Sequence, residues 1–351
     1  MRKHFTSILP VMAIGIFGLT ACGGAIDNGP SSEDGTLPWN YSGSGIVTDT
    51  YGLAHVREGN FFAEAKIKPW SSYWFPHSDP SLYEPMNGSK ELSPLQKYDQ
   101  WAKKSKKTDT TAAATEKATM ENSESDSWAG LCNAWSKASV MEKEPANRKA
   151  VDVDGVKFSA FDLKALLIKT YDNTVGFQNF GHRFNGARSD DFNDILPDQF
   201  HRVLQAELFE KGKPFIMDRD PGIQVWNVPV YKAEVVMARD PSNPNIMHVR
   251  TTVGTAGTRD DTDFIGTWSV NYEYFYDLYG ITAADGSFEV RSGVWTGASL
   301  DNHPDFVTVI PEKTVRQSDN PQLKTEWVDE ILEKAKKAPS LLDSLFGRGL
   351  M

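Results

Sequence analysis

The sequence predicts an α+β protein in which a helical lobe packs on a mostly antiparallel sheet or a partial barrel. Up to Gly212, apolar residues recur at the three- and four-residue spacing of amphipathic helices. From Lys213 onward, short alternating segments are separated by Gly, Pro, Asn and Asp turns, which is the pattern of paired strands. The 351 residues are 40% hydrophobic, enough to bury a large core. Segregated helices and strands define the α+β class.

Residues 1–21 have the features of a lipoprotein signal peptide. Arg2 and Lys3 supply its positive start, and the apolar run that follows is too short to span a membrane as a helix. The run ends in Leu-Thr-Ala-Cys, which resembles a bacterial lipobox, so Cys22 is expected to carry a lipid. Glycines rather than Asp follow Cys22, which by bacterial sorting rules favours the outer over the inner membrane. We expect a protein of the bacterial cell envelope, anchored through this lipid or released; an ordinary signal peptide or an uncleaved anchor is the alternative.

The rest of the chain divides into a tether and one domain. Residues 22–60 are rich in Gly, Ser, Pro and Asp, as flexible tethers are. The domain, residues 61–351, has a helical lobe over 61–212 and a β-rich lobe over 213–320, followed by a C-terminal helix.

Local signals define the elements of the helical lobe. Helices are expected after Ser93-Pro94, after Ser159 or Asp162, and from Pro197 to Gly212. Asp154-Gly155 predicts the turn of a small hairpin. The remaining expectations are an aromatic packing segment (66–76), a solvated helix or mobile loop (103–125), a Cys-containing helix (132–139) and an irregular stretch (177–194).

The β-rich lobe contains six candidate strands, and its turns contain Asp-Pro, Pro-Gly or Asp-Gly. An amphipathic helix is predicted after them, from Gln322 to Lys337. The strands are expected at 213–218, 224–237, 246–253, 268–278, 288–295 and 306–310.

Cys132 is the candidate nucleophile. The chain has two Cys, and assigning Cys22 to lipidation leaves Cys132 without a disulfide partner in the mature monomer. Cys132 follows a Gly-containing turn and opens a helix of small residues, where the helix N-terminus lowers the pKa of a thiol. The alternative is an inert Cys packed between Trp128 and Trp135.

A thiolate nucleophile needs a base and a group that orients the base. His201 lies on the helix after Pro197 and is followed by Asp218, which gives a Cys–His–Asp order along the chain. His303 lies at the entrance of the last apolar strand, where a loop and strand can present an imidazole to a helix N-terminus. The residues leave both histidines open as the base, and each also has a structural alternative as a cap, a surface group or an ion-pair partner.

Oxyanion stabilisation would come from the Cys132 backbone N–H and one side-chain donor. The candidate donors are Trp128, Trp226, Asn227 and Trp295, each of which also has a structural role as its alternative.

The sequence lacks the charge pattern and motifs of several other functional classes. The formal net charge of −10 disfavours binding to a nucleic-acid backbone. There is no HExxH, no CxxC pair, no phosphate-binding glycine loop and no GxSxG elbow. The acidic turn at 259–263 lacks the spacing of an EF-hand loop. We expect neither a metal nor a cofactor.

Several motifs, in order, resemble the transglutaminase elicitor family, which is known from oomycete cell-wall transglutaminases and bacterial relatives. The resemblance covers about residues 70–311, and Ala134 departs from the Gly that relatives tend to carry. The motifs are Trp-Ser-Ser-Tyr-Trp-Phe-Pro (70–76), Trp-Ala-Gly-Leu-Cys-Asn-Ala-Trp (128–135), Glu-Pro (144–145), Asp-Leu-Lys-Ala-Leu-Leu (162–167), Phe-His (200–201), Val-Trp-Asn-Val-Pro-Val (225–230) and His-Pro-Asp-Phe (303–306).

The resemblance implies a cysteine acyltransferase with a papain-like active-site layout and Cys132 as its nucleophile. In that activity, protein-glutamine γ-glutamyl transfer, the thiolate attacks a glutamine carboxamide and passes the acyl group to a lysine amine. The implied partners are proteins or peptides that carry these side chains. Two alternatives stay open: a protease, amidase or deamidase that uses water as acceptor, and a non-enzymatic surface-binding lipoprotein. The last predicts a buried Cys132 without a histidine beside it.

Overall fold

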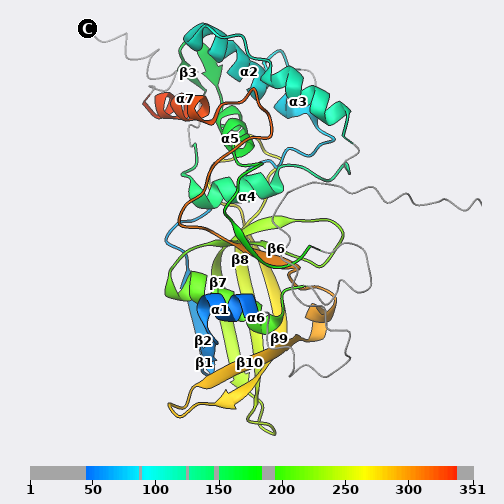
Figure 1. The fold of residues 1–351 in the computed structure, drawn as a ribbon, viewed down its shortest axis with the longest axis vertical. Coiled ribbons are helices and arrows are strands. Elements are labelled where there is room, and N and C mark those ends of the chain that lie inside the picture. Colours follow the sequence, from blue (N-terminus) through cyan, green and yellow to red (C-terminus); the bar gives the residue numbers. More distant parts are fainter. Residues whose placement is uncertain (1–44, 87–88, 124–125, 146–149, 184–193, 338–351) are drawn as a thin grey trace, which may run out of the picture.

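The computed structural model describes residues 45–86, 89–123, 126–145, 150–183 and 194–337 as an elongated α+β structure (Figure 1). A helical lobe forms one end and a sheet lobe forms the other, with helix α4 lying where they meet (Figure 1). Each lobe has its own cluster of buried hydrophobic side chains. The predicted α+β class is confirmed.

The sheet lobe is built on a nine-stranded sheet, as far as the described residues show, in the order β1-β10-β9-β8-β7-β6-β11-β5, with β2 also paired to β7. Every strand pairing in it is antiparallel. The sheet is open, so the partial barrel is not closed. Its strands are β1 (His55–Val56), β2 (Gly59–Glu64), β5 (Gln178–Gly181), β6 (Phe215–Asp218), β7 (Asn227–Arg239), β8 (Ile246–Ala256), β9 (Ser269–Thr282), β10 (Phe288–Trp295) and β11 (Phe306–Val309).

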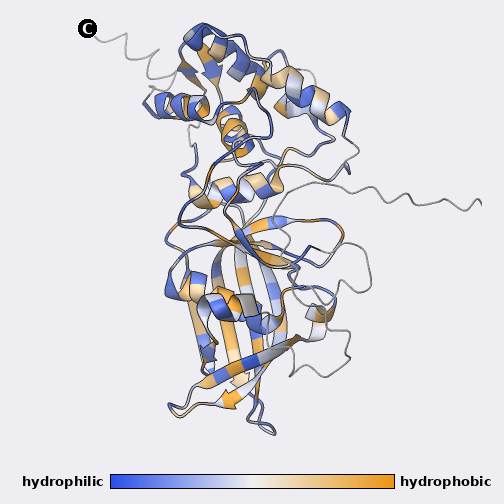
Figure 2. Ribbon diagram, viewed as in Figure 1, coloured by the Kyte–Doolittle hydropathy of each residue, from blue (hydrophilic) through white to orange (hydrophobic). Residues whose placement is uncertain are grey.

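Alternating side chains give the sheet one buried face. Met247, Val249 and Val253 of β8 are buried, and most of the residues between them are more exposed, as a half-buried strand requires. Hydrophobic positions accordingly recur along the long strands (Figure 2). The helices α1 (Gly45–Tyr51) and α6 (Pro197–Leu204) contact each other, and α6 packs against β9 and β10. The π-helical turn η5 (Gln205–Glu210) continues α6.

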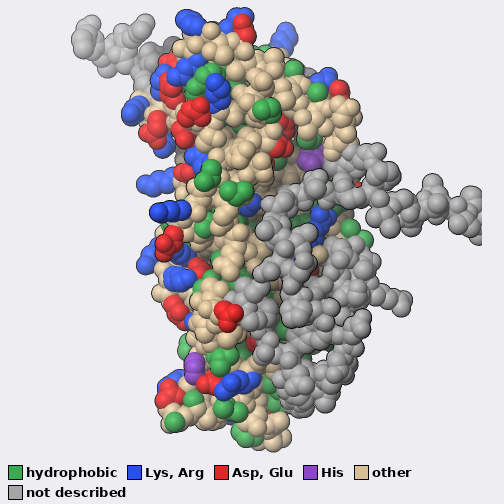
Figure 3. All heavy atoms as spheres, in the orientation of Figure 1, with side chains coloured by type: hydrophobic (Ala, Val, Ile, Leu, Met, Phe, Trp, Pro, Cys, Tyr) green, Lys and Arg blue, Asp and Glu red, His purple; other side chains and the backbone are tan. Residues whose placement is uncertain are grey.

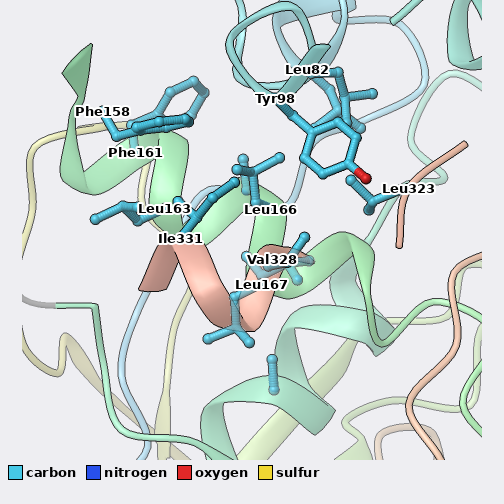
Figure 4. Close-up of a cluster of buried hydrophobic side chains, with 14 of the residues drawn as sticks. Leu82, Tyr98, Phe158, Phe161, Leu163, Leu166, Leu167, Leu323, Val328 and Ile331 are labelled. Carbon is cyan, nitrogen blue, oxygen red and sulfur yellow. The ribbon is translucent and has the colours of Figure 1, made fainter. Parts of the chain in front are cut away.

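The helical lobe is organised around helix α5 (Ala160–Lys169), whose residues are all buried. Ser159 forms a capping box with Asp162, which satisfies backbone N–H groups at the helix start. Leu166 and Leu167 of α5 pack against Val328 of the C-terminal helix (Figure 4). The other elements of this lobe are η2 (Pro80–Leu82), α2 (Pro94–Trp101), η3 (Ala102–Lys106), α3 (Ala112–Glu121), α4 (Cys132–Met141), β3 (Val151–Val153), β4 (Val156–Phe158) and α7 (Thr325–Lys337).

The hairpin of β3 and β4 turns at the predicted dipeptide. Asp154 and Gly155 both have positive φ angles, 53° and 82°, as a two-residue hairpin turn requires. The six predicted strands of the second half correspond to β6–β11, and the predicted last helix corresponds to α7.

Three boundaries differ from the prediction. The predicted tether, 22–60, overlaps α1 and β1 and the start of β2, whose Gly59 pairs with Met237 of the sheet. Helix α6, predicted within the helical lobe, packs in the sheet lobe because its apolar stripe meets β10. The stretch expected to be irregular, 177–194, contains β5. Its residues are mostly polar, so the sequence pattern did not indicate a strand paired with β11.

The signal peptide and Cys22 lie outside the described residues. No helix in the part of the chain that the structure describes has the length and apolar character to cross a membrane. Acidic and basic side chains are interspersed over the face shown in Figure 3, so the net charge does not form one patch there.

Candidate active site

Cys132 is the first residue of α4, which contacts β6 and β7. The Ser136 hydroxyl donates a hydrogen bond to the Asn227 carbonyl at 2.9 Å, which fixes the helix over the start of β7. The Cys132 side chain is buried, with 8% of the residue exposed, and its Sγ donates to the Val225 carbonyl at 3.6 Å. The positive end of the α4 dipole therefore lies at the thiol, where it favours the thiolate.

Asp218 ends β6 and pairs with Asn227 of β7. Phe215 and Met217 pack in the sheet-lobe core, so alternation directs the Asp218 side chain to the opposite face, the one that α4 covers. The carboxylate is fully buried, and burial raises the pKa of Asp218 to about 8. Within the described residues, its Oδ2 has no hydrogen-bond partner.

One peptide group separates the thiol from this carboxylate. Cys132 Sγ donates to the carbonyl of Val225, and the N–H of Trp226, in the same peptide unit, donates to Asp218 Oδ1 at 2.7 Å. The C=O and N–H of a trans peptide point in opposite directions. Cys132 and Asp218 therefore occupy the two sides of the Val225–Trp226 peptide.

The loop before Cys132 is held against the segment of Trp74 to His77. The Leu131 N–H donates to the Trp74 carbonyl and the His77 N–H donates to the Ala129 carbonyl, both at 2.7 Å. Between them, a Cβ on Gly130 would lie 2.6 Å from the Phe75 carbonyl oxygen. Only glycine permits this approach, so the Gly of the Cys motif has a packing reason.

Three half-buried tryptophans lie beside this loop. The ring of Trp226 packs against Trp74 at 6.3 Å and against Trp128 at 5.9 Å between centroids. The Arg219 guanidinium lies 5.3 Å from the Trp226 ring and pairs with Asp220. These side chains form an aromatic surface next to the Val225 carbonyl that Cys132 contacts.

His201 is placed in the sheet-lobe core rather than beside Cys132. Its Nδ1 shares a hydrogen bond with the Tyr276 hydroxyl at 2.8 Å, and burial lowers the pKa of His201 to about 4. The apolar stripe of α6 carries this imidazole against β9, whereas α4 lies over β6 and β7. The Cys–His–Asp order along the chain therefore does not assemble a contact between His201 and Cys132.

His303 is also engaged elsewhere. Its Nδ1 lies 2.8 Å from the Ser299 carbonyl and its Nε2 lies 3.0 Å from Asp194 Oδ2. Its ring stacks on Trp295, with centroids 5.2 Å apart. This placement matches the structural alternative of a loop His paired with an acid, although the acid is Asp194 rather than Asp301 or Asp305.

Of the predicted site residues, the structure brings Cys132 and Asp218 to the same peptide group, whereas the ring of His201 bonds to Tyr276 and that of His303 to Asp194. His77 is nearer in the fold, since its backbone joins the Cys loop, but its ring lines a pocket with Glu116, Lys169 and Leu131. Cys132 is buried, which matches part of what the non-enzymatic alternative predicts. Trp74 is a site residue that sequence reasoning missed, and only its place in the 70–76 motif signalled it.

Among the described residues, no cluster of three or more His, Cys, Asp or Glu side chains is arranged to hold a metal ion. Of the candidate oxyanion donors, Trp226 donates its indole N–H to Gln224 and Trp295 donates to the Ile195 carbonyl.

The fold, with the Cys-bearing helix over strands β6 and β7, defines an α+β protein in which a buried cysteine and a buried carboxyl group contact the same peptide group. Comparisons with known proteins show which family it resembles. The model of the transglutaminase elicitor family matches residues 81–246, a segment that contains Cys132, Asp218 and Asn227. The resemblance inferred from the motifs is confirmed over that segment.

A solved structure also has this fold. The GP42 transglutaminase from Phytophthora sojae, an oomycete protein, is similar with a TM-score of 0.65 and 20% sequence identity. The similarity covers 83% of this chain and 97% of that chain. No curated protein matches the chain.

Proposed function

We propose that this protein is a cysteine acyltransferase of the transglutaminase type, with Cys132 as its nucleophile. The observation that carries the proposal is the shared Val225–Trp226 peptide, which joins a thiol at a helix N-terminus to a buried carboxyl group. The family match over residues 81–246 supports the class of reaction.

The chemistry assigns the proton transfers to Asp218 rather than to a histidine. A carboxylate with a pKa of about 8 can accept the thiol proton near neutral pH and return it to a leaving group. The Cys132 thiolate then attacks the carbon of a glutamine carboxamide, and the C–N bond breaks as nitrogen takes the proton from Asp218 and leaves as ammonia. In the second half, a neutral lysine amine attacks the thioester, its proton passes to Asp218, and the thiolate leaves.

This route requires a local rearrangement. The Val225–Trp226 peptide lies between sulfur and carboxylate, so the proton passes only if the peptide turns, the thiol rotates or a water bridges the gap. The unpartnered Asp218 Oδ2 gives the carboxyl group a second oxygen for that transfer.

Transfer to water is the alternative with the same nucleophile, giving a protease, amidase or deamidase. A non-enzymatic, surface-binding role is the second alternative, and the burial of Cys132 favours it. The non-enzymatic role predicts that the buried thiol does not react selectively with an alkylating reagent, whereas both enzymatic functions predict a reactive Cys132.

Alkylation followed by acyl transfer tests the proposal. The purified domain is treated with iodoacetamide from neutral to alkaline pH, and labelling is located by mass spectrometry; because Asp218 has a pKa of about 8, we expect modification of Cys132 to accelerate as pH rises through that value, and Asp218→Asn to slow it. A glutamine peptide and a fluorescent primary amine are then supplied while ammonia is measured. Amine incorporation supports transfer, ammonia without incorporation supports hydrolysis, and an unreactive Cys132 refutes both.

We also propose that Cys22 is lipidated and anchors the protein in the bacterial cell envelope, at the outer membrane. The lipobox-like sequence supports this. Metabolic labelling with a fatty acid, compared between wild type and Cys22→Ser, tests it: labelling that persists in Cys22→Ser contradicts the assignment.

A further inference from the structure

The guanidinium of Arg259 packs on two aromatic rings without donating a hydrogen bond. Its central carbon lies 4.5 Å from the centroid of the Trp268 ring and 5.1 Å from that of the Phe264 ring. Its Nε is buried and has no hydrogen-bond partner, and within the described residues Nη1 and Nη2 have none either. Cation–π contacts stabilise the charge, but the N–H groups lie in the guanidinium plane and still need acceptors.

This arginine differs from the others that pack on aromatic rings. Asp260, Asp261 and Asp263 follow it closely, yet none of them forms an ion pair with it in the described structure. Four other arginines in the described part of the chain pack on rings and also have an acceptor: Glu210 for Arg202, Asp220 for Arg219, the Pro244 carbonyl for Arg239 and Glu142 for Arg316. A buried donor without an acceptor calls for an explanation, and for Arg259 the acceptor has to come from outside the chain.

Arg259 lies in the loop between β8 and β9, at the end of the sheet that α4 covers. Thr255, near the end of β8, pairs with Val230, three residues after the start of β7. At that start, the Asn227 carbonyl accepts the hydroxyl of Ser136 on α4. The loop of Arg259 therefore leaves the sheet on the side of the Cys helix.

Two backbone hydrogen bonds connect Arg259 to the loop that carries Cys132. The Arg259 N–H donates to the Ser72 carbonyl at 2.9 Å, and the Trp74 carbonyl, two residues further on, accepts the Leu131 N–H at 2.7 Å. Two residues of extended chain span at most about 7 Å. The Arg259 backbone therefore lies within about 20 Å of the Cys132 thiol, a distance that about six residues of an extended peptide cover.

The ring beside Arg259 is held in place before any ligand binds. The Trp268 N–H donates to the Ser71 hydroxyl at 2.8 Å, and the Trp268 carbonyl accepts the Gly257 N–H at 2.8 Å. Trp268 is 49% exposed, so the packed guanidinium and ring lie where a ligand has access. A guanidinium fixed in this way loses little freedom when two of its N–H groups bind a planar carboxylate.

We propose that Arg259 binds the carboxylate of an Asp or Glu side chain in the glutamine-bearing substrate, and so selects proteins with an acidic residue within about six positions of the reactive glutamine. The inference rests on the proposed function, because it concerns the acyl donor of that reaction. The donor is the substrate that is joined to Cys132 in the thioester, so a second contact on it fixes its register over the thiol. Arg259 is a positioning residue and takes no part in making or breaking bonds.

The neighbouring aspartates oppose an acidic ligand only weakly. Asp260, Asp261 and Asp263 are exposed, so water and salt screen their repulsion. A carboxylate bound to Arg259 makes direct, charge-assisted hydrogen bonds, which are the larger effect. The site therefore recognises an acidic side chain by contact rather than by attraction at a distance.

Peptides that differ at one position test the assignment. A peptide with a single glutamine carries Glu, Ala or Lys at each of about six positions on either side, and kcat/KM for ammonia release is measured. We expect wild type to prefer Glu over Ala by about 5–20-fold at one position or at two adjacent ones. In Arg259→Gln this ratio should fall to about one, and Arg259→Glu should prefer Lys at the same position.

Three controls accompany this scan. Arg250→Gln should keep the Glu preference, because Arg250 is exposed, lies farther back on β8 and pairs with Glu273 at 3.8 Å. The reversed preference of Arg259→Glu is a gain that a misfolded protein does not produce, so it is decisive if Arg259→Gln folds poorly. The same substitutions are made in a lysine-bearing acceptor peptide, and labelled glutamine peptides are titrated into Cys132→Ala protein, with and without Arg259→Gln, to measure binding without chemistry.

The outcomes separate this inference from the proposed function. Ammonia release without a Glu preference that depends on Arg259 overturns the carboxylate site and leaves the acyltransferase standing. A Glu preference found only in the acceptor peptide overturns the assignment to the acyl donor. If no peptide releases ammonia, the proposed function fails, and binding decides the role of Arg259: tighter binding of the Glu peptide that Arg259→Gln abolishes supports the site, and equal binding of all three peptides overturns it.

Discussion

Cys132 and Asp218 bind opposite sides of one peptide group, the sulfur through the Val225 carbonyl and the carboxylate through the Trp226 N–H. A thiol can donate to that carbonyl, whereas a thiolate would face a carbonyl oxygen and be repelled by it. This contact holds the thiol in its protonated form, and the α4 dipole favours the thiolate once the peptide or the thiol turns away from it. Asp218 is the ionisable group that lies across that peptide from the sulfur.

Asp218→Asn should remove the proton acceptor while preserving shape. The amide oxygen still accepts the Trp226 N–H, so the loop keeps its anchor, but acyl transfer should fall about 10²–10⁴-fold. Asp220→Asn is the matched control, since Asp220 lies two residues away and pairs with Arg219. Steady-state rates of acyl transfer from a glutamine peptide check this prediction, and melting temperatures show whether each variant is folded. A fully active Asp218→Asn protein rules out the proton-transfer role.

The pH dependence of activity should follow Asp218. Because burial raises the pKa of Asp218 to about 8, the base form accumulates only as pH rises through that value, and the wild-type rate should rise with it. Rate measurements across neutral to alkaline pH should show this rising limb in wild type and not in Asp218→Asn. The same limb in both proteins would assign it to another group.

Stability should also report the buried carboxyl group. Its folded pKa of about 8 lies above its ordinary value of 3.8, so between these values the folded state holds the proton more tightly than the unfolded chain. The free energy of unfolding should therefore fall as pH rises across this window and level off above it. Urea titrations of wild type against Asp218→Asn should diverge with rising pH, the variant gaining relative stability; parallel curves would contradict burial of a titrating carboxyl.

His201→Gln and His303→Gln should leave Cys132 reactive. Both rings bond to groups in the sheet lobe, to Tyr276 and to Asp194, so alkylation at Cys132 should proceed close to the wild-type rate. Loss of alkylation in either folded variant would restore that histidine as the base.

His201 should make the fold sensitive to acid. Burial lowers the pKa of His201 to about 4 from 6.5, so the unfolded state binds the proton more readily and stability falls as pH drops from 6.5 toward 4. Comparison of wild type and His201→Gln by urea unfolding at several pH values should show a shallower acid loss in the variant. An unchanged acid slope would assign that loss to other groups.

Gly130→Ala should disturb the Cys loop through packing. The new methyl would lie 2.6 Å from the Phe75 oxygen and 2.8 Å from Pro76 Cα, both backbone atoms that cannot yield cheaply. We expect a loss of about 1–3 kcal/mol in unfolding free energy and a slower alkylation of Cys132. Gly222→Ala is the control and should behave as wild type, because its methyl would lie 3.1 Å from the end of the Asp220 side chain and at an ordinary contact distance of 3.9 Å from the Gln224 nitrogen.

Local sequence patterns predicted many of the helices, strands and turns. Alternation predicted β6–β11, Asp154-Gly155 predicted the β3–β4 turn, and Ser159 or Asp162 was the predicted start of α5, which begins after Ser159. Each of these predictions depends on residues that are near one another in the chain. The missed strand, β5, is polar and gains its hydrogen bonds from β11, more than a hundred positions away, so no local signal identifies it. The pairing of β2 with β7 was not predicted either, because β7 is also far from β2 in the sequence.

For the candidate site, the sequence alone determined that Cys132 opens a helix behind a glycine turn and that its motifs resemble one family. The tertiary structure decided which ionisable group approaches the thiol. Chain order nominated His201 and His303, yet the packing of α6 and of the loop before β11 directs both rings to other partners. The β6–β7 register instead brings Asp218 to the peptide beside Cys132, and the close backbone approach that Gly130 permits brings Trp74 to the Cys loop. Such placements depend on contacts between distant segments, and local sequence does not encode the distance between them.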